Sequence, residues 1–167
     1  MYQVNDYVMY KRDVCKVKEI LKDYFKGHDY YCLSPMDDLS LTLKVPVEDK
    51  CNNLRPLISK KEVEEIIQQI PHISIVDSQD KFLENEYRKL LNSNQHTDLV
   101  KIIKTTYLRN KKREEENKKI GDRDFQYYEK AEKYLYQEFS IVLDLSYDKT
   151  KEYVIREVRK LEGSEVK

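Results

Sequence analysis

Residues 39–47 (LSLTLKVPV) carry a leucine or valine at every second position without interruption. The odd-numbered positions are leucine or valine, and the even-numbered positions are serine, threonine, lysine and proline. A period of two is typical of a strand with one buried face. From Ser59 onward the apolar residues instead recur at spacings of three and four, which is typical of helices. The sequence therefore predicts an α+β chain with a β domain over residues 1–58 and an all-α domain over residues 59–167.

The β domain contains several short runs of aromatic and branched residues separated by turn-forming segments. The turns are expected at Lys26–Asp29 and Ser34–Asp38. Short antiparallel strands at this spacing predict a small SH3-like or Tudor-like barrel. The expected strands are Tyr7–Tyr10, Val14–Ile20, Tyr30–Leu33, Leu39–Val47 and a fifth at Leu54–Ile58.

The α domain begins with a capping box, in which Ser59 is followed three residues later by Glu62. Pro71 is expected to end this first helix, and no proline follows it. About five helices are expected in total. The later ones are predicted around Leu83–Leu91, from Thr97 or Asp98 through Leu108 with a solvated extension at Arg109–Lys119, from Gly121 and Asp122 to about Val142, and around Val154–Leu161. The tail at residues 163–167 is expected to fray.

The composition indicates a cytoplasmic protein without a membrane span. No apolar run approaches the roughly 18 residues that cross a bilayer, and the N-terminus lacks the apolar core of a signal peptide. Cys15, Cys32 and Cys51 form no closely spaced pair, so we expect reduced thiols and neither a metal site nor a cofactor. With three glycines and no nucleophile motif, the chain offers no phosphate loop and no catalytic residue, which predicts that it is not an enzyme.

Basic residues concentrate in one segment. Residues 99–123 carry nine basic and four acidic side chains, a net charge of +5 in a chain whose overall net charge is zero. Lysine and arginine contact nucleic-acid phosphates without reading sequence, whereas the alternative is a solvated helix face. The candidate DNA-binding cations are Arg88, Lys89, Lys101, Lys104, Arg109, Lys112, Arg113 and Arg123.

The alternating strand offers a second candidate surface. Lys44 lies on its polar face, where its simplest role is to keep the sheet soluble. A strand at the edge of a sheet can also pair with a strand of a partner protein, a mode of binding that needs no deep pocket.

Six segments, in order along the chain, resemble the CarD/CdnL family of bacterial transcription regulators, and most closely its Gram-positive branch. They are residues 4–10 (VNDYVMY), 14–17 (VCKV), 41–49 (LTLKVPVED), 54–62 (LRPLISKKE), 99–109 (LVKIIKTTYLR) and 131–138 (AEKYLYQE).

The resemblance implies a Tudor-like module that docks on the β subunit of RNA polymerase. Lys44 matches a basic position in the polymerase-facing strand, with Thr42, Val45 and Pro46 beside it. The resemblance also implies that the helical domain contacts the promoter DNA backbone at the upstream edge of the transcription bubble and modulates open-complex stability. Lys101, Lys104 and Arg109 fall on a helix that is also basic in the family.

The chain departs from the family pattern where DNA is concerned. Many members insert a tryptophan at the minor groove, but this chain has none, and Phe82 is the only aromatic residue in the equivalent segment at residues 76–82. A basic position near the start of the fourth helix is occupied here by Asp124-Phe125-Gln126. The alternative is therefore a protein-interaction adaptor that binds polymerase or another protein without productive DNA contact. The sequence makes no prediction of an oligomeric state.

Overall fold

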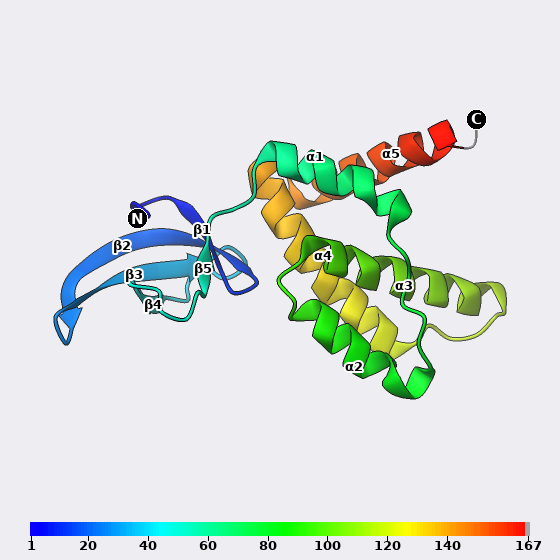
Figure 1. The fold of residues 1–167 in the computed structure, drawn as a ribbon, viewed down its shortest axis with the longest axis horizontal. Helices are drawn as coiled ribbons and strands as arrows, with labels where there is room; N and C mark the ends of the chain where they lie inside the picture. Colours follow the sequence, from blue (N-terminus) through cyan, green and yellow to red (C-terminus); the bar gives the residue numbers. More distant parts are fainter. Residues whose placement is uncertain (166–167) are drawn as a thin grey trace. The chain divides into compact units, whose positions relative to one another are not determined.

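The chain consists of two compact units, which the computed structural model describes over residues 1–165 (Figure 1). The sheet unit is Met1–Ile58 and the helical unit is Ser59–Lys167. The fold is α+β, with strands confined to the first unit and helices to the second in the part that is described.

The sheet unit is a five-stranded antiparallel sheet with strand order β4-β3-β2-β1-β5. Its strands are β1 (Tyr7–Tyr10), β2 (Asp13–Phe25), β3 (His28–Pro35), β4 (Leu43–Pro46) and β5 (Leu54–Arg55). β1 has the predicted bounds, whereas β5 is shorter than predicted. β4 and β5 form the two edges, and no pairing between described residues joins them. The sheet is therefore open, and closure into a barrel is not confirmed.

The strand predicted at Leu39–Val47 is wrong in its first four residues, because pairing begins only at Leu43. Leu39 and Leu41 are 53% and 52% exposed. The carboxylate of Asp38 accepts the Ser40 N–H at 3.1 Å, and the Asp38 carbonyl accepts the Leu41 N–H at 3.1 Å. These local bonds form a turn that uses the N–H groups a strand would offer to β3. The apolar alternation therefore continues beyond the strand itself.

The β2–β3 hairpin is longer than predicted, since β2 continues from Ile20 to Phe25. Lys26 and Gly27 form its turn, and both have positive φ angles, of 51° and 78°. Two successive positive φ angles match the twist of the flanking strands. Most residues of this arm beyond Val17 are exposed or half-buried, so the arm lacks the apolar alternation by which a strand is predicted.

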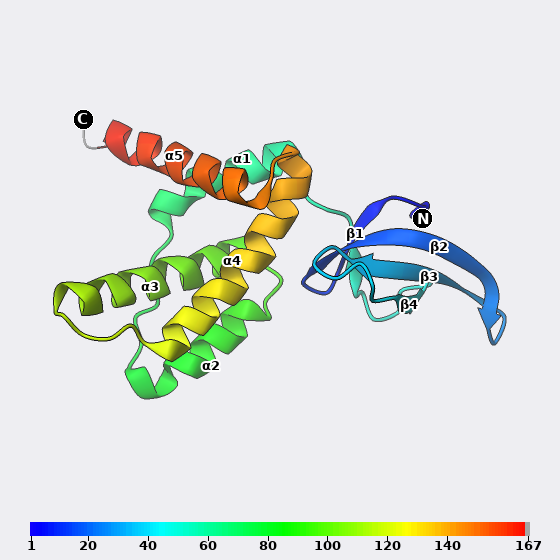
Figure 2. The ribbon, with the colours of Figure 1, turned by 180° about the vertical axis from the view of Figure 1, so that it is seen from behind.

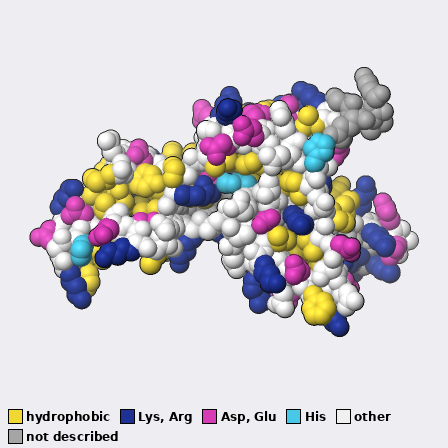
Figure 3. Space-filling model, viewed as in Figure 1, with side chains coloured by type: hydrophobic (Ala, Val, Ile, Leu, Met, Phe, Trp, Pro, Cys, Tyr) yellow, Lys and Arg dark blue, Asp and Glu magenta, His cyan; other side chains and the backbone are white. Residues whose placement is uncertain are grey.

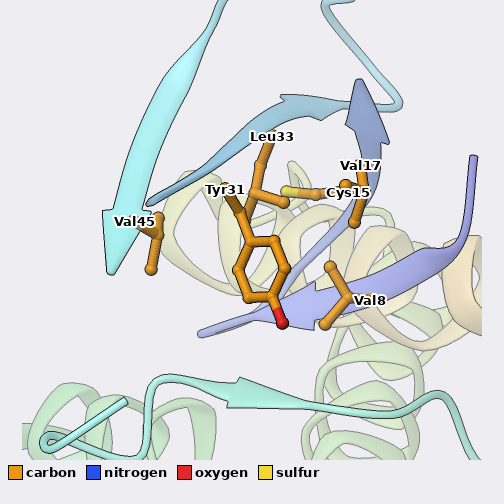
Figure 4. Close-up of a cluster of buried hydrophobic side chains, with 6 residues drawn as sticks. All are labelled: Val8, Cys15, Val17, Tyr31, Leu33 and Val45. Atoms are coloured by element: carbon orange, nitrogen blue, oxygen red, sulfur yellow. The ribbon is translucent and has the colours of Figure 1, made fainter. Parts of the chain in front are cut away.

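One face of the sheet carries the core of this unit (Figure 4). Figure 4 shows six buried side chains from four strands, which converge around the Tyr31 ring. The Tyr31 hydroxyl accepts a hydrogen bond from the Tyr2 N–H at 3.0 Å, which fastens the N-terminal segment to this core. The cluster consists of Val8, Cys15, Val17, Tyr31, Leu33 and Val45. β4 is thus held by the burial of Val45, and its neighbours Lys44 and Pro46 remain exposed.

In the helical unit, α4 is the central helix, and the other four α-helices pack around it (Figure 2). The elements are α1 (Lys60–Gln69), the 3-10 turn η1 (Ile70–His72), α2 (Asp80–Leu91), α3 (His96–Glu115), α4 (Asp122–Leu143) and α5 (Tyr147–Glu165). Leu135 and Phe139 of α4 and Leu99 and Ile102 of α3 are buried. None of these helices, within the described residues, is long and apolar enough to cross a membrane.

The helix boundaries follow most local signals. The capping box is confirmed, because the Ser59 hydroxyl accepts the Glu62 N–H and the Glu62 carboxylate accepts the Ser59 N–H. α3 begins at His96, one residue before its predicted start, and ends at Glu115, short of Lys119. The tail is helical through Glu165, so fraying from Gly163 onward is not observed there; residues 166 and 167 lie outside the described part.

Candidate functional site

Lys44 lies on the edge strand β4, with its side chain exposed and oriented by a tyrosine of the hairpin arm. Its Nζ donates a hydrogen bond to the Tyr24 hydroxyl at 2.8 Å and lies 4.8 Å from the centroid of the Tyr24 ring. This hydrogen bond raises the pKa of Lys44 above its ordinary value. The contact fixes the position of a cation that would otherwise sample many rotamers.

The four residues predicted to bind polymerase, Thr42, Lys44, Val45 and Pro46, differ in solvent exposure. Thr42 and Pro46 are exposed together with Lys44, but Val45 is 6% exposed and faces the core. Among the described strands β4 pairs only with β3, so its outer edge faces no strand. An unpaired edge presents backbone groups to an incoming strand. The edge of β4 therefore combines a strand-pairing surface with a positioned cation.

A shallow hollow of about 260 Å³ adjoins β4. The loop that follows β4 forms one wall, and its shape is held by Asp49, whose carboxylate accepts the N–H groups of Asn53 at 2.9 Å and Leu54 at 2.8 Å. Tyr10 and Tyr30 contribute aromatic surface. The hollow thus gives a partner side chain room beside Lys44.

In the helical unit, a buried carboxylate binds two of the predicted DNA-contacting arginines. Asp124, at the start of α4, is 1% exposed. Its Oδ2 accepts hydrogen bonds from Arg109 Nε at 2.9 Å and Arg113 Nη1 at 2.7 Å, and its Oδ1 accepts one from the Tyr87 hydroxyl at 2.9 Å. We call Tyr87, Arg109, Arg113 and Asp124 the Asp124 cluster. It joins α2, α3 and α4 at one point.

The electrostatics of the Asp124 cluster favour the charged carboxylate. Burial acts to raise the pKa of Asp124, but the hydrogen bonds from Arg113, Arg109 and Tyr87 outweigh it and hold that pKa below its usual value. Burial and the adjacent Asp124 charge raise the pKa of Tyr87, so this residue remains a neutral donor. Arg109 Nη2 also lies 3.2 Å from Asp80 Oδ1 on α2. The guanidinium groups of Arg109 and Arg113 therefore stabilise the packing of α2, α3 and α4.

The interpretation of Arg109–Lys119 as a solvated extension is wrong for Arg109 and Arg113, whose side chains are 27% and 25% exposed. Lys104 is also used internally, because its ammonium donates to the carbonyl oxygens of Ile70 at 2.8 Å and Ile73 at 2.7 Å. These carbonyls lie at the end of the first helical segment, where acceptors need partners. Three of the eight cations assigned to DNA thus stabilise the helical unit.

Gly121 is adjacent to the Asp124 cluster, and we expect Gly121→Ala to destabilise the helical unit by about 1–3 kcal/mol, as overpacking does. An added Cβ would lie 2.5 Å from Arg113 Nη1, and this guanidinium is held by Asp124 and by Asn110 Oδ1. Urea unfolding followed by circular dichroism measures the effect. Gly163→Ala is the control, because there the methyl group meets no described atom within 4 Å and improves helix propensity. Equal stability of both variants would contradict the prediction.

Of the five remaining candidate cations, Arg88, Lys89 and Lys112 are exposed, whereas Lys101 and Arg123 are half-buried. Arg88 and Lys89 form surface ion pairs with Glu84 and Glu86 on the same helix, which hold them weakly. Lys101 and Lys112 lie on one face of α3, since eleven residues are close to three turns. Arg123 Nη1 donates to the carbonyl oxygen of Asp80, a long bond of 3.4 Å.

Phe82, the proposed counterpart of the family tryptophan, is 50% exposed on the first turn of α2. The ammonium of Lys81 lies 4.9 Å from the centroid of its ring. Figure 3 shows that basic and acidic side chains are interspersed on the visible face of the helical unit, without a broad basic patch there.

Neither family models nor curated proteins match this chain in sequence comparisons. Within the described residues, no group of three or more His, Cys, Asp or Glu side chains could hold a metal ion. Cys15 and Cys32 are buried and Cys51 is exposed, all as free thiols.

Sequence reasoning missed the structural roles of two residues, Tyr24 as the partner of Lys44 and Asp124 as the partner of Arg109 and Arg113. The contact of Tyr24 with Lys44 depends on the extended arm and was not visible in the sequence. A signal for Asp124 was present, since Arg109 and Arg113 are four residues apart and share a helix face that needs an acidic partner.

Proposed function

We propose that this chain is a non-enzymatic bacterial transcription regulator of the CarD/CdnL type that docks on the β subunit of RNA polymerase. In this proposal the five-stranded sheet unit is the Tudor-like docking module. The observation that carries the proposal is the exposed edge of β4, on which Tyr24 positions Lys44. One of the six segments that resemble the family, residues 41–49, contains this edge.

In this proposal the helical unit contacts the promoter DNA backbone and modulates open-complex stability. The exposed cations Arg88, Lys89 and Lys112, together with the half-buried Lys101 on the same face of α3 as Lys112, supply phosphate contacts without sequence readout. Phe82 is the apolar side chain available as a wedge at a base step. A phenylalanine buries less surface than a tryptophan, so we expect weaker stabilisation of the bubble than a tryptophan-bearing member would give.

Co-purification tests the docking directly. The full chain is immobilised and incubated with purified core RNA polymerase, and crosslinking followed by mass spectrometry identifies the subunit that contacts residues 41–49. We expect crosslinks to the β subunit. Absence of polymerase from the eluate at micromolar concentrations would refute the proposal.

The DNA contact makes a separate prediction. We expect the combined Arg88→Ala, Lys89→Ala, Lys101→Ala and Lys112→Ala variant to bind a promoter fragment more weakly. The slope of log affinity against log salt should become shallower by about 0.9 for each phosphate that the variant no longer neutralises. Fluorescence anisotropy at several salt concentrations measures this slope. Lys60→Ala with Lys61→Ala, two exposed lysines on α1, is the control and should leave the slope unchanged.

The second candidate function is an adaptor that binds polymerase or another protein without productive DNA contact. Its support is that Lys104, Arg109 and Arg113 are held by internal hydrogen bonds. A salt slope near zero for the unmodified chain, together with retained polymerase binding, would favour the adaptor over the DNA-contacting regulator.

A further inference from the structure

A groove of about 470 Å³ lies in the helical unit, between α3 and α5. Figures 1 and 2 show these two helices running in the same direction and diverging toward their C-terminal ends. Its floor is formed by Ile70 of η1 and by Tyr128, Glu132, Leu135 and Tyr136 of α4. Both walls are therefore helices, and exposed residues on each wall leave the groove accessible to solvent.

The groove is lined mainly by apolar surface that no described segment covers completely. Val100 and Val154 are each 3% exposed, but Tyr107 on the α3 wall is 55% exposed and Ile155 on the α5 wall is 39% exposed. On α3, Tyr107 lies about two turns beyond Val100 on the same face of the helix. On α5, Ile155 follows Val154 directly and widens the apolar stripe toward solvent. Such paired stripes resemble half of a helix-packing interface.

The length of the groove fits a short helix. On α3 the lining extends from Val100 to Lys111, and on α5 it extends from Lys151 to Glu162. Each span contains twelve residues, and its eleven steps of 1.5 Å give a length of about 16 Å. A helix of about three turns covers this distance, and its apolar residues at spacings of three and four would lie between the two walls.

The charges around the groove favour an acidic occupant. Lys104 is held by the carbonyls of Ile70 and Ile73, and Lys151 pairs with Glu132 at 3.0 Å. Lys111 and Arg159, one on each wall, form no ion pair with any residue that the structure describes. Both flanks of an inserted helix would therefore meet a cation, with Glu162 as the opposing acid at one end.

We propose that this groove binds an amphipathic helix of about three turns from a partner protein, with leucine-like residues on one face and acidic residues on both flanks. The site stands apart from the proposed function, because β4 does not line it, and its two flanking cations, Lys111 and Arg159, are not among those assigned to DNA. The helical unit would then bind a partner protein at a site separate from the β4 edge.

The test uses the full chain and two fluorescein-labelled helical peptides of about twelve residues. Both peptides carry leucines at i, i+4, i+7 and i+11, and they differ in having glutamate or lysine on the flanks. We expect the acidic peptide to bind with a Kd in about the micromolar range, and the basic peptide to bind at least about tenfold more weakly. Fluorescence anisotropy measures both affinities.

Two pairs of variants locate the binding. Ile155→Glu, inside the groove, should weaken binding of the acidic peptide at least about tenfold. Leu108→Glu, at an exposed leucine of α3 outside the lining, should leave this binding unchanged. Lys111→Glu with Arg159→Glu should reverse the preference between the peptides. Lys119→Glu with Arg156→Glu, at two exposed cations outside the lining, should preserve it.

Three outcomes would overturn the proposal. The first is the absence of binding by either peptide at about 1 mM. The second is equal binding of both peptides, which would show that the groove binds apolar side chains without distinguishing acidic from basic flanks. The third is a dimer in analytical ultracentrifugation that Ile155→Glu abolishes, which would identify a second copy of the chain as the occupant.

Discussion

Asp124→Asn is expected to reduce the stability of the helical unit by about 3 kcal/mol, the largest effect of a single substitution that we predict. Removing one partner from a buried ion pair leaves the other charges without compensation, which costs about 3–5 kcal/mol. We take the lower end because the side chains of Arg109 and Arg113 are about a quarter exposed, at 27% and 25%. Urea unfolding of the full chain, followed by helical circular dichroism, measures the loss.

Glu129→Gln, at an exposed carboxylate of the same helix, is the matched control and should change stability little. The pH dependence gives an independent check. Because the pKa of Asp124 is lower in the folded chain than in the unfolded chain, its stabilisation is complete above about pH 4 and is lost as the pH falls through the folded pKa. The difference between wild type and variant should therefore shrink in acid. A difference that is constant from pH 7 to about pH 2 would contradict this account.

Lys44→Glu is expected to weaken binding to RNA polymerase by about tenfold or more, provided that β4 is the docking edge. The substitution reverses an exposed charge at the centre of the proposed surface and also removes the hydrogen bond to Tyr24. Because Lys44 is exposed, the fold of the sheet unit should be unaffected. Biolayer interferometry with immobilised core polymerase measures the affinity, and circular dichroism confirms the fold.

Two further variants separate charge from position. Lys18→Glu reverses the charge of an exposed lysine on a different strand, β2, and should leave the affinity for polymerase within about twofold of the wild-type value. Tyr24→Phe keeps the aromatic ring beneath the ammonium but removes the acceptor oxygen, so we expect an intermediate loss of about two- to threefold. If Lys18→Glu weakened binding as much as Lys44→Glu, net charge rather than the β4 edge would account for the interaction.

The sequence predicted those elements whose signals are local. The capping box at Ser59 and Glu62 correctly placed the start of α1, and the aromatic and branched run at Tyr7–Tyr10 correctly placed β1. The alternation at Leu39–Val47 was misleading because a hydrophobic pattern does not show whether a neighbouring strand is present. Asp38 closes a local turn there, and Leu39 and Leu41 remain exposed. The hairpin arm beyond Ile20 was missed for the opposite reason, since it is a paired strand without a buried face.

The candidate site was less predictable, because the roles of charged residues depend on partners distant in sequence. Composition correctly identified a basic segment, but it could not distinguish Arg109, bound to Asp124 on another helix, from Lys112, which is exposed. Lys104 likewise binds carbonyls more than thirty residues earlier, at Ile70 and Ile73. Only the packing of α3 against its neighbours separates cations that stabilise the fold from those that are free to bind a ligand.

The Asp124 cluster has a consequence for how this sequence can change through descent. Arg113 occupies the space that a Cβ at Gly121 would need, and both arginines depend on the same carboxylate. A substitution at residue 109, 113, 121 or 124 is therefore expected to cost less when a compensating change accompanies it at another of these positions. In chains that share ancestry with this one, we expect these four positions to vary together.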